Sequence, residues 1–258
     1  MEIKETVEIN FLGVLVHKNF RFQGHFEKVL DKVKKGVNAL IRAKFILNYQ
    51  AKINIYHSLI HSHINYCCLS WISKISSKQM KQLSTLQKKA MRAVFNAKYN
   101  THSNILFYLS RVTKVEDLFE KESLLFMYRF KENILPTAIS KAIKGLTEVD
   151  KPLTRNHASS KSLSIKGVKK GDIFYDMIDF WNKCKSEIKE QSFEMPSVKE
   201  RINHLLRQRY EFDCDRTKCF SCFRTNEVGL ESYMKLQDPT LHPWRALLFS
   251  PSSSSSPS

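Results

Sequence analysis

Acidic residues are absent from one long stretch of this sequence. No Asp or Glu occurs between Asp31 and Glu116, whereas fifteen Lys and Arg residues lie in that interval. The whole chain has 42 Lys and Arg against 25 Asp and Glu, which gives a formal net charge of +17. Because a solvated surface usually mixes both signs, we expect this interval to face a polyanion. Nucleic acid is the commonest polyanion, and an anionic membrane or an acidic protein is the alternative.

Other scarcities narrow the class of protein further. Only seven glycines occur, which argues against a Gly-rich sandwich or barrel and favours helices. No apolar run of about 18 residues is present, so we predict no membrane span. The N-terminus has early acids and no apolar region, unlike a signal peptide. Six cysteines are sparse for a disulfide scaffold and indicate free thiols, so we expect an intracellular protein, nuclear or cytoplasmic and not secreted.

Residues 7–22 are predicted to form two short strands. Apolar residues alternate along 7–11 and then, in the opposite register, along 12–16, with Gly13 at the change. Residues 17–19 have the composition of a turn. A two-stranded hairpin is marginal in water by itself, so it needs a larger sheet or a helix to pack on.

Helical periodicity dominates the rest of the chain. Apolar residues at spacings of three and four predict helices at 26–41, 56–67, 77–95, 115–133, 172–188 and 197–210. The middle of the helix at 115–133 is apolar nearly all round, which predicts deep burial. We therefore predict a mainly α fold, a helical bundle with a short N-terminal β-hairpin. The expected organisation is a hairpin at 1–24, a basic helical domain at 25–140, a linker at 141–171, C-terminal helices at 172–212, and an irregular Cys-containing segment with a disordered Ser/Pro tail at 213–258.

The helix predicted at 77–95 has two different faces. With 100° between successive residues, its apolar residues fall in one arc that only Gln79 and Gln87 interrupt. The opposite arc is basic and contains Lys78, Lys81, Lys88, Lys89 and Arg92. These are the candidate nucleic-acid-binding residues, because Lys and Arg hold a sugar–phosphate backbone without reading its sequence. A merely solvated face, or a basic amphipathic helix for anionic lipid, is the alternative.

Family resemblance is carried by the order and spacing of five segments, which are FLGVLVHKNFRFQGHF, YHSLIHSHINYCCLSW, LSTLQKKAMRAVF, YNTHSNILFYL, and LTRNHASSKSL followed by FWN. Over residues 7–190 the chain resembles the C-terminal part of the reverse transcriptase of non-LTR, LINE-type retrotransposons. The similar region runs from just after the palm through the thumb and a following helical region. The resemblance implies a primer-grip-like role for Phe11, Leu12 and Gly13, and a thumb that holds the template–product duplex.

The resemblance does not extend to the catalytic centre. A reverse transcriptase needs palm carboxylates that bind two metal ions, but the sequence has no Tyr-X-Asp-Asp signature and no two adjacent Asp residues. We therefore expect a non-sequence-specific binder of RNA, DNA or their hybrid that uses no cofactor. Alone, it should be inactive as an RNA-directed DNA polymerase. The alternative is an inactive retrotransposon relic, or a helical protein-interaction module without nucleic-acid binding. The sequence leaves open whether a palm-bearing polymerase is a partner.

Cysteines near the C-terminus raise the question of a metal. Cys214, Cys219 and Cys222 have C-x4-C-x2-C spacing, with His242 as the candidate fourth ligand. Zinc prefers four thiolate or imidazole ligands, and only the close pair Cys219 and Cys222 has the spacing of two ligands that bind one zinc ion. Plant-type iron–sulfur proteins share this spacing, but no fourth cysteine follows here. We predict no metal site and no catalytic residue, because the histidines at 17–63 lack nucleophile-elbow glycines and a supporting acid.

Overall fold

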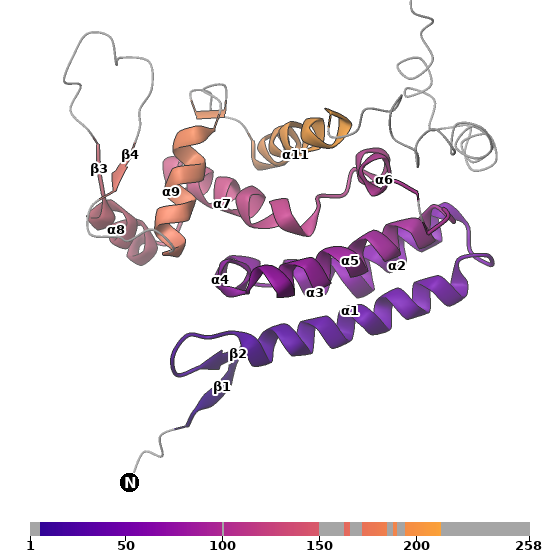
Figure 1. Cartoon of the computed structure of the whole chain (residues 1–258). Helices are drawn as coiled ribbons and strands as arrows, with labels where there is room; N and C mark the ends of the chain where they lie inside the picture. Colours follow the sequence, from indigo (N-terminus) through magenta and orange to yellow (C-terminus); the bar gives the residue numbers. More distant parts are fainter. Residues whose placement is uncertain are drawn as a thin grey trace, which may run out of the picture.

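The protein is mainly helical with an antiparallel hairpin at its N-terminus, which confirms the predicted fold class (Figure 1). The computed structural model describes residues 6–99, 101–149, 163–165, 172–184, 188–189 and 194–212. Its elements are, in chain order, β1 (Glu8–Phe11), β2 (Val14–His17), α1 (Gln23–Ala43), α2 (Tyr49–Tyr56), a π-helical turn (His57–His61), α3 (Ser62–Asn65), α4 (Cys68–Trp71), a 3-10 turn (Ile72–Lys74), α5 (Ser77–Val94), α6 (Ser103–Ser110), α7 (Val115–Lys131), α8 (Thr137–Leu146), β3 (Thr147–Val149), β4 (Leu163–Ile165), α9 (Ile173–Lys183) and α11 (Met195–Phe212).

The N-terminal hairpin turns at Leu12 and Gly13. Strands β1 and β2 pair antiparallel and leave only these two residues as their connection. Both have positive φ, 47° at Leu12 and 84° at Gly13, as a type I′ turn requires. The predicted change at Gly13 is therefore the hairpin turn itself. The turn predicted at 17–19 is also present, since the Phe20 N–H donates to the His17 carbonyl over 2.8 Å, and it leads toward α1.

Only one strand of this hairpin packs against the rest of the protein. Val14 of β2 is buried, whereas every residue of β1 is exposed. The Tyr66 hydroxyl donates to the Leu12 carbonyl over 2.5 Å and fixes the turn. The hairpin thus packs through β2, as the marginal stability of an isolated hairpin requires, while β1 is left uncovered.

The helices form successive layers. Helix α1 lies along one side, α5 and α2 run beside it, and α7 separates them from α9 and α11 (Figure 1). The buried apolar residues form two clusters that meet within α7. The first extends from the hairpin to Phe119, and the second joins Leu124 to the facing sides of α9 and α11. The deep burial predicted for the middle of α7 is confirmed, and the buried positions of this helix run from Val115 to Tyr128.

The second predicted helix differs most from expectation. The sequence predicts a regular helix at 56–67, but α2 already begins at Tyr49, and a π-helical turn at His57–His61 follows it. Helix α3 then ends at Asn65, and Cys67 has a left-handed backbone with φ of 48°. Apolar spacing alone could not show this, because a π turn shifts the register of side chains by one residue.

Gly36 explains where the π-helical turn lies. A Cβ built on Gly36 of α1 would be 2.7 Å from the Leu59 carbonyl oxygen and 2.9 Å from the Ile60 side chain. Side chains do not pack at such distances, so α1 and the π turn can approach this closely only with glycine at this position. Gly36, a residue type that disfavours helices, is thus the point of contact between α1 and the π-helical turn.

The segment after α7 contains structure that the sequence does not predict. The expected linker at 141–171 includes the end of α8 and the antiparallel strands β3 and β4. Pro136 stands directly before α8, where its missing N–H is not needed, and its carbonyl accepts from the Ser140 N–H over 3.0 Å. The helices predicted at 172–188 and 197–210 correspond to α9 and α11. Within the described ranges, no helix has the length and apolar character needed to cross a membrane.

Changing Gly36 to Ala should destabilise the fold although alanine is the better helix former. Helix propensity alone would stabilise α1 by about 1 kcal/mol, but forcing a methyl group against the Leu59 carbonyl costs about 1–3 kcal/mol. We expect a net loss of about 1 kcal/mol or more in the free energy of unfolding, measured with urea. Gly145→Ala in α8 is the matched control, because nothing lies within 4 Å of its added Cβ. If Gly36→Ala is as stable as Gly145→Ala, the close approach has no energetic role.

Candidate nucleic-acid interface

Helix α5 carries the predicted basic face and begins with a complete capping box. The Ser76 hydroxyl accepts from the Gln79 N–H over 3.3 Å, and the Ser76 N–H donates to the Gln79 side chain over 2.8 Å. These bonds satisfy donors of the first turn, so the helix begins at Ser77. The Gln79 amide also donates to the Gln23 side chain over 2.5 Å, which ties the start of α5 to the start of α1.

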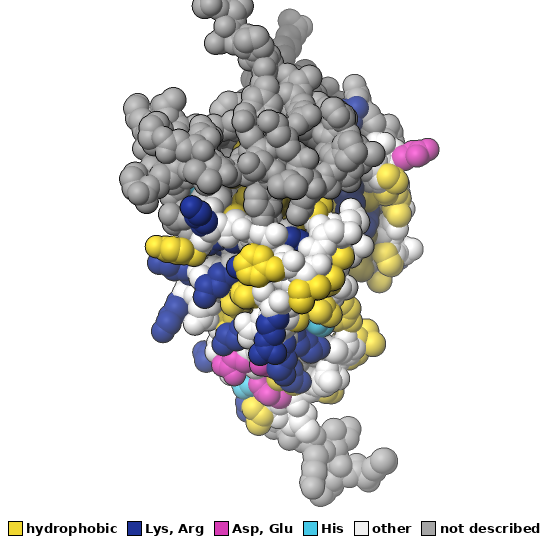
Figure 2. Space-filling view, turned by 90° about the vertical axis from the view of Figure 1, so that its right-hand side faces the viewer, with side chains coloured by type: hydrophobic (Ala, Val, Ile, Leu, Met, Phe, Trp, Pro, Cys, Tyr) yellow, Lys and Arg dark blue, Asp and Glu magenta, His cyan; other side chains and the backbone are white. Residues whose placement is uncertain are grey.

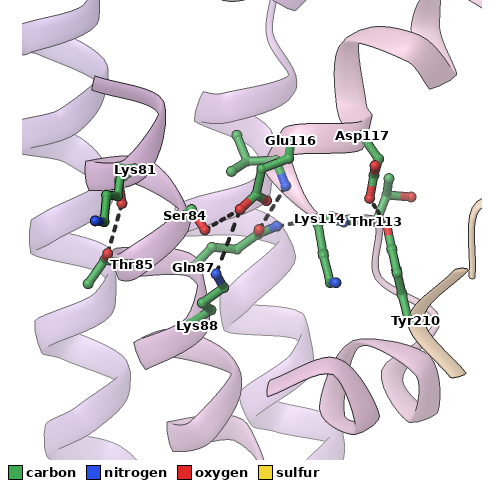
Figure 3. Close-up of polar contacts among 11 residues, drawn as sticks. Lys81, Ser84, Thr85, Gln87, Lys88, Thr113, Lys114, Glu116, Asp117 and Tyr210 are labelled. Carbon is green, nitrogen blue, oxygen red and sulfur yellow. Dashed lines mark hydrogen bonds and ion pairs between the residues drawn. The ribbon is translucent and has the colours of Figure 1, made fainter. Parts of the chain in front are cut away.

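Three of the five predicted basic side chains are exposed on one face of α5. We call Lys78, Lys81 and Lys89 the lysine row. Along the helix axis, Lys78 and Lys89 are about 16 Å apart at 1.5 Å per residue. Thr85 lies between them, and its hydroxyl donates to the Lys81 carbonyl over 2.8 Å, within the helix (Figure 3). Among the described residues, no acid forms an ion pair with the lysine row.

Lys88 is paired within the protein. Its ammonium lies 3.7 Å from the Glu116 carboxylate, and both side chains are a little over one third exposed. The Ser84 hydroxyl donates to the same carboxylate (Figure 3). A pair this accessible contributes about 1 kcal/mol or less, but it partly neutralises the charge of Lys88. Of the predicted basic face, Lys88 is therefore the residue least suited to a phosphate.

Arg92 is bound to the loop that follows α5. Its Nε–H donates to the Thr101 carbonyl over 3.0 Å, and Thr101 is buried. Burial lowers the pKa of the Arg92 guanidinium, which nonetheless stays charged because arginine does not deprotonate in proteins. The helical wheel places Arg92 on the basic arc. Arg92 lies near the C-terminal end of α5, however, where the loop after the helix covers its side chain.

Gln87 is the residue whose role sequence reasoning missed. Its amide donates to the Tyr56 hydroxyl over 2.9 Å and to the Thr113 carbonyl over 3.0 Å, and its carbonyl accepts from the Val115 N–H over 2.8 Å. Gln87 is buried, and burial raises the pKa of the Tyr56 phenol. One side chain thus joins α2, α5 and the start of α7. The available signal was a glutamine inside an otherwise apolar arc.

Lys52 also belongs to the acid-free interval but is fully buried. Its ammonium donates to the Asn96 side-chain oxygen over 2.8 Å and to the Lys44 carbonyl over 3.3 Å. Burial lowers the pKa of this amine. Nothing in the sequence distinguishes Lys52 from the exposed lysines around it, so the positive surface is smaller than the sequence suggests.

The primer-grip-like residues Phe11, Leu12 and Gly13 lie at the turn of the hairpin, and all three are exposed. The turn is near the N-terminal end of α1, whereas the loop after α1 is at its far end (Figure 1). The contact between Gln23 and Gln79 brings the start of α5 to the hairpin end of the molecule.

The histidines predicted to lack a catalytic role do form one local cluster. The rings of His57 and His61 are 5.4 Å apart. Burial first, and then the nearby Lys121 ammonium, lower the pKa of both, that of His61 to about 4. Burial raises the pKa of the Cys68 thiol to about 12, so it is a protonated, unreactive group at neutral pH. At neutral pH the two imidazoles are therefore uncharged and the thiol is protonated.

Metal binding has no support in the part of the chain that the structure describes. No group of three or more His, Cys, Asp or Glu side chains gathers in those ranges. Cys214, Cys219, Cys222 and His242 lie outside them.

Changing Gln87 to Leu should strongly destabilise the fold. The volume is nearly kept, but the Tyr56 hydroxyl, the Thr113 carbonyl and the Val115 N–H each lose a partner in a buried place. We expect a loss of about 2–5 kcal/mol in the free energy of unfolding, measured with urea. Gln82→Leu is the matched control on the exposed face of the same helix and should change stability by about 0.5 kcal/mol or less. Equal effects of both changes would mean that Gln87 does not orient α5.

Comparison with known proteins adds no relative. No family model, no curated protein and no solved structure matches the chain. Inference about its function therefore depends on the residues described above.

Proposed function

We propose that the protein binds nucleic acid without sequence specificity, with the lysine row of α5 contacting backbone phosphates. The observation that carries the proposal is a set of exposed lysines on one face of a helix whose other face is fixed in the core, and none of the three has an acidic partner among the described residues. A spacing of about 16 Å between its ends covers several phosphates, since duplex DNA carries one charge per about 1.7 Å of axis. Such contacts position a duplex and do not read its bases.

The resemblance to the post-palm region of LINE-type reverse transcriptases supports the choice of partner. In that comparison the helices from α1 onward are thumb-like, and the natural ligand is an RNA–DNA hybrid. Phe11 and Leu12, exposed at the hairpin turn, would approach the primer end. The chain has no palm carboxylates, so the proposal is binding and not polymerisation. A ligand of this kind places the protein inside the cell, in the nucleus or the cytoplasm.

One observation favours a second candidate, a protein-interaction module. All of β1 is exposed, including Ile9 and Phe11, which are 57% and 62% accessible. An uncovered edge strand with apolar side chains is a usual place for another chain to add a strand. β1 and α5 are different elements, so separate variants can test the two candidates.

Changing the lysine row to glutamine should weaken binding without unfolding the protein. Lys78→Gln, Lys81→Gln and Lys89→Gln together keep helix propensity and leave the buried face of α5 untouched. Each lost phosphate contact lowers the logarithmic salt slope by about 0.7–0.9, so the slope should shrink by about two to three units. Fluorescence anisotropy with a labelled RNA–DNA hybrid at several salt concentrations measures both quantities, and circular dichroism checks the fold.

A variant of equal charge separates a local site from the total charge. Lys141 and Lys144 of α8 and Lys199 of α11 are also exposed, and changing all three to glutamine removes the same charge elsewhere. We expect this control to keep most of the affinity and the salt slope. If it loses as much as the α5 variant, the lysine row is only part of a diffuse positive field, and the proposed interface is wrong.

A further inference from the structure

Three large apolar side chains project from one end of the helical layers. Ile46, Phe45 and Tyr99 are 84%, 78% and 89% exposed, more than any other large apolar residue that the structure describes. Phe45 and Ile46 are in the loop between α1 and α2, and Tyr99 is in the loop after α5. We call these three residues the aromatic tip. An exposed apolar group of this kind on loops commonly marks a binding surface.

The two loops are held together by a buried lysine. The Lys52 ammonium donates to the Lys44 carbonyl in the first loop over 3.3 Å and to the Asn96 side chain in the second over 2.8 Å. Beside it, the rings of Tyr49 and Phe95 lie 5.3 Å apart. The loops therefore form one unit, with the exposed side chains on a scaffold that is already ordered before anything binds.

Tyr99 is presented by a closed turn. The Thr101 N–H donates to the Lys98 carbonyl over 3.1 Å, and the Arg92 side chain holds the Thr101 carbonyl over 3.0 Å. Thr101 is buried, so the turn is anchored and Tyr99 lies at its outer side. The backbone that carries Tyr99 is therefore held in place, which lowers the conformational entropy that this loop loses on binding.

The surroundings of the tip are positive. The Lys44 ammonium lies over the Phe45 ring at 4.4 Å from its centre. Lys98 is exposed on the same loop as Tyr99, and Arg42 is exposed in the last turn of α1, just before the loop that carries Phe45. No acid occurs in the sequence between Asp31 and Glu116, so neither loop contains one. Figure 2 shows this end of the molecule, where hydrophobic side chains lie among Lys and Arg side chains. The occupant should be anionic and also offer flat apolar surfaces.

We infer that the aromatic tip stacks on unpaired bases of a nucleic acid whose backbone follows the lysine row; the inference rests on the proposed function. Helix α5 leads directly into the loop that carries Tyr99, so the lysine row runs away from the tip along the helix. Lys78 is about 24 Å from the end of α5, well beyond one Debye length at physiological salt. A planar bilayer at the tip would leave that lysine unused, whereas a chain-like anion reaches both. Aromatic rings and cations together are how proteins bind single strands.

The test compares two ligands and four proteins, all as the full chain. The ligands are a blunt RNA–DNA hybrid and the same hybrid with a single-stranded extension of about eight nucleotides. The tip variant is Phe45→Ala with Tyr99→Ala. Its matched control is Phe20→Ala with Ile134→Ala, which removes exposed apolar groups elsewhere. Wild type should prefer the extended hybrid, and the tip variant should lose about tenfold or more on that ligand only. The control should keep the preference, and Tyr99→Phe should keep it too, because the ring is retained.

Each outcome separates the inference from the proposed function. The salt slope should be equal in wild type and tip variant, because no charge is removed. If wild type binds both hybrids with a steep salt slope but shows no preference, or the tip variant keeps the preference, the inference is wrong and the proposed function stands. If wild type binds neither hybrid, both are wrong. Tip-dependent binding to phosphatidylcholine vesicles containing about one third phosphatidylserine, without any preference between the hybrids, would overturn the inference in favour of a lipid surface.

Discussion

The side-chain amide of Gln87 sets the rotation of α5, and the charge pattern of the surface follows from that rotation. Its three hydrogen bonds reach α2 through Tyr56 and the start of α7 through Thr113 and Val115. An unsatisfied buried group costs about 1–3 kcal/mol, so few rotations of the helix are tolerated. At 100° per residue, Lys78 and Lys89 lie about 180° and 200° from Gln87. They therefore face outward as a consequence of how the opposite face is bonded.

Positive residues of the acid-free interval divide into two structural groups. The lysine row has no internal partner among the described residues, whereas Lys52, Lys88 and Arg92 are each bound to another part of the chain. Two of the bound residues connect separate segments. Lys88 joins α5 to α7, and Arg92 joins α5 to the loop that follows it. A single sign of charge in the sequence thus serves two purposes, and a count of basic residues overstates the surface that is free to bind.

Much of the fold was predictable because regular helices leave a periodic signature. The bounds of α5, the burial of α7 and the presence of α9 and α11 all follow from spacings of three and four residues. The departures occur where the backbone leaves the regular α geometry. The π-helical turn shifts the apolar register beyond Tyr56, and Cys67 interrupts the helical path with a left-handed backbone. Propensity and periodicity contain no information on either feature, because tertiary contacts such as Gly36 against Leu59 determine them.

The part of the candidate site that lies on a single helix was predictable from the sequence. A helical wheel finds the lysine row, because exposed residues of one helix depend only on which face is apolar. It could not find the aromatic tip, because Phe45 and Tyr99 belong to different loops that a buried lysine brings together. Nor could it show that Arg92 is internal, since the loop that covers it returns from beyond the helix.

The hydrogen-bond acceptors of the internally bonded cations leave most of the positive charge of the protein in place. Lys52 and Arg92 donate to carbonyl and amide oxygens, which are neutral, whereas Lys88 meets the Glu116 carboxylate. A neutral acceptor satisfies the hydrogen-bonding need of an ammonium or guanidinium without cancelling its charge. At the lower effective dielectric of a partly buried site, that charge acts over a longer range than it does in water. The buried and the exposed lysines of the acid-free interval therefore add to the same positive potential, because no acid within residues 32–115 opposes them.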